Sequence, residues 1–174
     1  MPKITAWIIP VTTLAILCTI MPAEPQTGFA PHPLSGTWEL KRAEIARPDG
    51  TIGVDANYGP DARGLLIVDQ TGRYSLQVFR PDRPKFASGD KARGTPEEYK
   101  FALLGLSTHT GRISVDTANH QLVFHIEHAA FPNWEHTDQR RAYQVSDEEL
   151  SYQVPPGPSG TSAISVWRRL AGPR

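Results

Sequence analysis

Short apolar or alternating stretches, separated by turns rich in glycine, proline and aspartate, make up most of the chain after residue 33. These stretches predict strands at 36–46, 64–69, 73–80, 111–115, 121–127, 137–145, 149–154 and 162–169. The residues between the second and third strands, Gln70-Thr71-Gly72, predict a hairpin turn. Eight or so short antiparallel strands in succession are typical of a closed meander barrel. We therefore expect an all-β protein.

One segment has the pattern of a helix instead. The sequence Thr-Pro-Glu-Glu at 95–98 provides a capping threonine, a proline suited to the first turn and a glutamate that completes a capping box. The predicted helix covers 95–104 and ends before a glycine. Tyr99, Leu103 and Leu106 recur at helical spacing, which would allow the helix to lie across one end of the barrel as a lid.

The N-terminal residues have the pattern of a targeting segment. No charge occurs between Lys3 and Glu24, and the stretch is largely apolar and ends in a small residue. This pattern predicts a signal peptide over 1–23, cleaved after Ala23, and hence an exported protein that is periplasmic or secreted. The alternatives are a membrane anchor formed by the uncleaved segment and a lipoprotein modified at Cys18.

After this segment, the chain divides into a leader and one domain. Residues 24–33 contain three prolines and predict a flexible leader, so the folded domain is expected over 34–170. The chain has 18 basic and 18 acidic residues, which argues against a nucleic-acid partner because such proteins need a basic surface. Its single cysteine excludes an internal disulfide.

The two ends of the predicted barrel carry a recognisable pair of motifs. Gly36-Thr37-Trp38 opens the first strand, and Trp167-Arg168-Arg169 lies on the last. Together they are similar to the strands that close a lipocalin barrel. Further stretches at 47–50, 59–66, 80–84, 86–90, 94–99, 131–134 and 138–141 resemble the bacterial lipocalin-like domain family. The resemblance covers about 34–169 and implies a closed antiparallel barrel of about eight strands with one short helix.

The resemblance also implies how the barrel closes. In lipocalins, a basic residue on the last strand stacks over the tryptophan of the first, a cation–π contact that seals the barrel floor. Gly36, Trp38 and Arg169 are the matching positions here, with Arg169 favoured over Arg168. One departure from the family pattern concerns His109, because aromatic residues are usual just before Gly111. If His109 faces the interior, this cavity is more polar than is usual in the family.

Alternation along the first strand suggests a buried carboxylate. Residues two apart on a strand point to the same face, so Glu44 shares the face of Trp38 and Leu40. An interior Glu44 would be a candidate general acid or base, because apolar surroundings raise the pKa of a carboxyl group. Structural pairing with a neighbouring arginine, or exposure at the rim, is the alternative.

The strands at 121–127 and 137–145 are expected to pair about a loop centred near Asn133. This register brings His125 close to Arg141, and Tyr143 shares the face of Arg141. In one interpretation this polar face is a solvated ladder of ion pairs and the opposite, apolar face is the core. In the other, the polar face lines the interior and His125 is a second candidate for acid–base chemistry.

Three functions follow from these observations. The first is binding of a small, hydrophobic or amphipathic molecule inside the barrel, without a cofactor. The candidate ligand-binding residues are Trp38, Leu40, Tyr74, Leu76, Tyr99, His109, Arg141 and Tyr143. The second, the alternative, is an isomerase or cyclase that uses Glu44 or His125. The third is a scaffold whose interior is filled by side chains. No metal site is expected, since the histidine spacing matches no metal motif.

Overall fold

The computed structural model describes residues 30–171. The expected signal peptide at 1–23, and residues 24–29 of the leader, lie outside this range. The strands are β1 (Gly36–Ala46), β2 (Ile52–Val54), β3 (Arg63–Val68), β4 (Arg73–Phe79), β5 (Leu106–Asp116), β6 (Gln121–Ala129), β7 (Thr137–Val145), β8 (Glu149–Gln153) and β9 (Ser162–Arg169). The helices are α1 (Pro96–Leu104) and the single 3₁₀ turn η1 (Pro132–Trp134). Within 30–171, no helix is long and apolar enough to cross a membrane.

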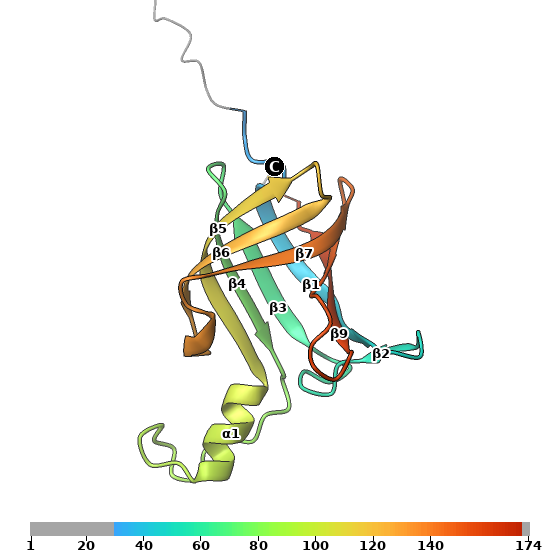
Figure 1. Cartoon of the computed structure of the whole chain (residues 1–174). Helices are drawn as coiled ribbons and strands as arrows, with labels where there is room; N and C mark the ends of the chain where they lie inside the picture. The colour runs from blue at the N-terminus through green and yellow to red at the C-terminus, as the bar shows by residue number, and fades with distance from the viewer. Residues whose placement is uncertain (1–29, 172–174) are drawn as a thin grey trace, which may run out of the picture. The chain divides into compact units, whose positions relative to one another are not determined.

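The strands form one antiparallel sheet that closes on itself (Figure 1). From β3 to β9 each strand pairs with the next along the chain, and β1 pairs with both β3 and β9. β2 pairs only with the end of β1, so it is a flap beside the barrel. The predicted fold, a closed barrel of eight antiparallel strands, is confirmed.

One end of the barrel is sealed by Trp38. Its ring is fully buried, and its indole N–H donates to the Leu34 carbonyl oxygen at 2.9 Å. The Arg169 guanidinium carbon lies 3.9 Å from the centre of this ring, and Arg169 is paired with Trp38 across the β1–β9 ladder. Gly36 makes room for this contact, since a Cβ there would lie 2.9 Å from the Arg169 Nη1. These three residues form what we call the barrel floor.

Glu44 is not inside the barrel, so the alternation expected for β1 is wrong beyond its middle. A bulge between Leu40 and Arg42 shifts the register by one residue. As a result Ala43 is buried, whereas Glu44 lies on the outer face, where its Oε1 accepts from the Arg42 Nε at 3.0 Å. No pattern in the sequence predicts this bulge.

The expected register of β6 and β7 is also wrong. His125 is paired with Asp138 and not with Arg141, which lies opposite Leu122. The 3₁₀ turn and a positive φ of 59° at His136 move the centre of the loop, so the register of β7 differs from the expected one by three residues. A shift by an odd number of residues exchanges the two faces of a strand. The polar residues are therefore divided, with Arg141 inside the barrel and His125 outside.

The helix begins and ends as predicted but does not act as a lid. The Thr95 side chain accepts from the Glu98 N–H and the Glu98 carboxylate accepts from the Thr95 N–H, so the capping box is confirmed. None of the α1 side chains is buried, and Tyr99 packs against Phe86 of the preceding loop. α1 follows β4 at the barrel end opposite the floor (Figure 1), and Leu106 belongs to β5.

The last part of the expected leader contacts the barrel. The His32 backbone N–H donates to the Gln70 carbonyl oxygen at 3.0 Å, and the His32 carbonyl accepts from the Ser35 N–H. Burial lowers the pKa of the His32 imidazole. His32 is therefore held against the β3–β4 turn, and the prediction of a flexible leader is wrong at this position.

Candidate functional site

The barrel interior is filled near its floor and hollow beyond it. Large buried side chains pack the floor half, among them Trp38, Leu66 and Trp167. A cavity of about 420 Å³ occupies the other half and reaches the turn after β2 and the loop between β8 and β9. The scaffold hypothesis, in which side chains fill the interior, therefore does not hold for this half of the barrel.

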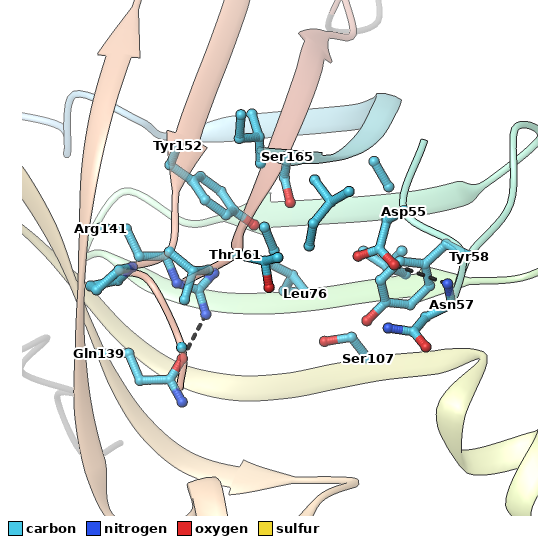
Figure 2. A pocket seen from close by; sticks show the side chains of 18 of the residues that line it. Asp55, Asn57, Tyr58, Leu76, Ser107, Gln139, Arg141, Tyr152, Thr161 and Ser165 are labelled. Atoms are coloured by element: carbon cyan, nitrogen blue, oxygen red, sulfur yellow. Dashed lines mark hydrogen bonds between the residues drawn. The ribbon is translucent and has the colours of Figure 1, made fainter. Parts of the chain in front are cut away.

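The cavity wall is mostly apolar, and its charged groups lie on two sides, with the hydroxyl-bearing Thr161 and Ser165 between them (Figure 2). Leu76 also lies between the two sides, with Gln139 and Arg141 on one side and Tyr58, Asp55 and Ser107 on the other (Figure 2). Further apolar wall is contributed by Ala43, Ile45, Val78, Val154 and Ile164. This arrangement suits one small molecule with an apolar body and polar ends.

Arg141 is the buried cation of the cavity. Its guanidinium lies over the ring of Phe124, 4.2 Å from the centre, and 4.9 Å from the centre of the Tyr152 ring. Its Nη2 donates to the Gln139 Oε1 at 2.8 Å. β7 carries Arg141 and Gln139 on its inner face because the observed register places them opposite Leu122 and Phe124.

His109 lies beside Arg141 as a neutral group. It is fully buried on β5, and its Nδ1 shares a hydrogen bond of 2.7 Å with the Tyr74 hydroxyl. Burial, with a smaller contribution from the nearby Arg141 charge, lowers the pKa of His109 to about 3. Burial likewise raises the pKa of the Tyr74 hydroxyl well above its ordinary value. Neither group changes its charge near neutral pH.

The opposite side of the cavity is formed by the turn after β2. The Asp55 carboxylate is buried and accepts from the Asn57 backbone N–H at 2.9 Å, which fixes the turn. Tyr58 follows on the same turn, and burial raises the pKa of its hydroxyl. Ser107, near the start of β5, contributes a second hydroxyl to this side.

Of the eight candidate ligand-binding residues, the structure brings Leu76, His109 and Arg141 together in the cavity wall. Tyr74 lies behind His109 and holds it, while Trp38 and Leu40 belong to the packed core.

The other candidates lie away from the cavity. Tyr99 is on the exposed helix, and Tyr143 stacks on His120, with 4.7 Å between ring centres. His125 is on the outer surface, where its Nδ1 lies 2.8 Å from the Asp138 carboxylate and its Nε2 is 2.9 Å from the Ser114 hydroxyl. Neither candidate for acid–base chemistry, Glu44 or His125, therefore lines the cavity.

Several lining residues were not among the candidates. Tyr152 belongs to the strand pattern Leu-Ser-Tyr at 150–152, whose alternation with the buried Leu150 places both on the inner face. Trp134 and Gln139 lie in the stretch whose loop centre was misplaced. No pattern in the sequence pointed to Tyr58 or Asp55, because a three-residue strand and its turn are too short to show a hydrophobic periodicity. Among residues 30–171, no three His, Cys, Asp or Glu side chains gather as a metal site would require.

Comparisons with known proteins agree with this architecture. The chain is similar to the 4'-hydroxy-3'-methoxypropiophenone carrier protein ppsC of the fungus Aspergillus oryzae, with 29% identity over 106 residues. The matched region is 55% of this chain and 96% of that protein. No solved structure matches the chain.

A family model describes nearly the whole barrel. The model of the lipocalin-like domain matches residues 35–170, from the residue before Gly36 to the residue after Arg169. The match thus spans both strands of the barrel floor and all strands between them. The chain belongs to the lipocalin-like domain family.

Proposed function

We propose that this protein is a carrier that binds one small, mostly apolar molecule in the barrel cavity. The observation that carries the proposal is the cavity of about 420 Å³, with a mostly apolar wall and charged groups on two opposite sides. Its volume lies within the usual range for small-molecule sites, about 300–1,000 Å³. The similar protein from Aspergillus oryzae is named as a carrier of 4'-hydroxy-3'-methoxypropiophenone, and a molecule of comparable size is the ligand class that we propose here.

The chemistry of the cavity favours binding over catalysis. An isomerase or cyclase needs a group that gives or takes a proton near neutral pH. The pKa of His109 is lowered to about 3, and burial raises the pKa values of Tyr58 and Tyr152. The one lining carboxylate, Asp55, accepts a hydrogen bond within its own turn. Positioned, unreactive polar groups serve a carrier better than an enzyme.

Titration with the neutral fluorescent probe N-phenyl-1-naphthylamine tests the proposal. We expect saturable binding with a dissociation constant on the order of 1 μM, a typical value for modest burial of an aromatic probe. Replacement of Ala43, a small residue of the cavity wall, by phenylalanine should fill the space and weaken binding roughly tenfold or more. A matched replacement of the exposed Ala142 should leave binding unchanged.

Two results would contradict the carrier function. One is probe binding that does not saturate. The other is equal affinity of the Ala43→Phe and Ala142→Phe variants, which would place the probe outside the cavity. Circular dichroism of both variants verifies that the barrel is intact.

We also propose that the protein is exported to the periplasm or secreted after cleavage of residues 1–23. The support is the charge-free apolar stretch that ends in Ala23. A protein anchored in the membrane by the same segment is the alternative. In an exported carrier, the barrel would bind its ligand outside the cytoplasm.

A further inference from the structure

Among residues 30–171, no carboxylate forms an ion pair with the buried Arg141. The residue is only 6% exposed. Its Nε is buried without any hydrogen-bond partner, while Nη2 is bonded to the neutral Gln139 amide. Removing a cation from water without a compensating charge is costly, so its retention inside the barrel calls for an explanation.

Packing alone does not supply that explanation. The rings of Phe124 and Tyr152 flank the guanidinium and fix its position, and cation–π contacts of this kind offset part of the desolvation cost. They leave the positive charge itself unneutralised. An apolar side chain of similar length would pack against the same two rings without that cost.

Arg141 and Gln139 face the cavity together (Figure 2). Resting on the carrier function above, we propose that the ligand is an amphipathic carboxylic acid whose carboxylate binds to the Arg141 guanidinium. The two oxygens of a carboxylate match the planar fork of a guanidinium, and Arg141 lines the cavity wall. The carboxylate thus supplies the missing counter-ion.

The rest of the cavity sets the orientation of this acid. Leu76 and the neighbouring apolar wall receive the hydrocarbon or aromatic body. The Asp55 carboxylate lies on the opposite side of the cavity from Arg141 (Figure 2). Because like charges repel, Asp55 disfavours the reverse orientation and leaves Tyr58 and Ser107 to receive a neutral polar end of the ligand.

A matched pair of probes tests the inference on the unmodified protein. 2-Naphthylacetate and 2-naphthylacetamide have nearly the same shape and differ in charge, and both are fluorescent. At pH 7 the acid should bind at least about tenfold more tightly than the amide, because only the acid forms a charge-assisted pair with Arg141. Equal affinities, or tighter binding of the amide, would overturn the inference.

Two neighbouring arginines provide the variant and its control. Arg141→Met should bring the affinity for the acid down to that for the amide and leave amide binding within about threefold. Arg140→Met removes an arginine on the outer face that pairs with Asp116, and it should keep the full preference for the acid. If Arg140→Met abolishes the preference as well, general surface charge explains it and the inference is wrong.

The remaining outcomes separate this inference from the carrier function. If Arg141→Met does not fold by circular dichroism, Arg141→Lys replaces it; this variant keeps the charge without the fork, and an intermediate preference for the acid is expected. A Lys variant with no preference for the acid would argue against a charge-based contact. If N-phenyl-1-naphthylamine binds while the acid has no advantage over the amide, the carboxylate inference fails alone. If none of the three probes binds, the carrier function fails with it.

Discussion

Replacement of Arg169 by methionine should reduce the free energy of unfolding by about 2–3 kcal/mol. The change keeps an unbranched side chain but removes the guanidinium that covers Trp38 at the barrel floor. Because Trp38 and Arg169 are paired across β1 and β9, the change weakens the strand pairing that closes the barrel.

Three contacts of the guanidinium determine this magnitude. Its carbon lies 3.9 Å from the centre of the Trp38 ring, and a cation–π contact of this kind contributes about 1 kcal/mol. Nη1 donates to the Ser35 carbonyl oxygen at 2.6 Å and Nε to the Asp147 carbonyl oxygen at 2.7 Å. A hydrogen bond from a charged donor contributes about 1.5–3 kcal/mol when buried, and less here because Arg169 is partly exposed and water can replace it.

Urea unfolding, followed by tryptophan fluorescence, measures the effect. The neighbouring Arg168→Met variant is the control, since that side chain is 64% exposed and forms only a surface ion pair with Glu39. The control should lose between about 0 and 1 kcal/mol. Equal losses in the two variants would refute the reasoning, because the floor contact would then contribute no more than a surface pair.

Three further predictions concern the floor, the cavity and the N-terminus. Gly36→Ala should destabilise the protein more than Gly50→Ala in urea unfolding, since both positions have positive φ but only a Cβ at Gly36 would press on Arg169; equal losses would argue against that steric role. The free energy of unfolding should fall by about 2 kcal/mol between pH 6.5 and 4.5, because the pKa of His109 is about 3 when folded and about 6.5 when unfolded, so the unfolded chain binds the extra proton. His109→Asn should remove the His109 part of this slope. It should leave contributions of the same sign from His32 and from carboxylates such as Glu98 and Glu149, whose pKa values are also lowered. An unchanged slope would show that His109 does not cause it. N-terminal sequencing of protein recovered from the periplasm or medium should begin at or near Glu24, whereas a cytoplasmic product starting at Met1 would contradict export.

The architecture could be predicted from the sequence because its signals are local. Turn residues mark most of the strand ends, and the Thr95 capping box fixes the start of α1. The barrel floor followed from a resemblance at Gly36, Trp38 and Arg169, and these three residues do meet in the structure.

The site was harder to predict because it depends on register. A single bulge after Leu40 turns Glu44 outward, and a shifted loop before β7 turns Arg141 inward. Each error exchanges the faces of a whole strand segment, so the correct boundaries of β1 and β7 still gave a wrong list of lining residues. The strand predicted at 111–115 begins earlier, since β5 is Leu106–Asp116. His109 was a candidate ligand-binding residue because it departs from the family pattern. The predicted strand did not include it.

The β1–β9 pairing also affects the order in which the barrel folds. The first and last strands of the barrel are neighbours in space but far apart along the chain, and contacts of this kind are slow to form. Until β9 pairs with both, β1 and β8 are open edges that can pair with strands of other chains. Barrel closure is therefore a late event, and a chain shortened before β9 should accumulate as aggregates.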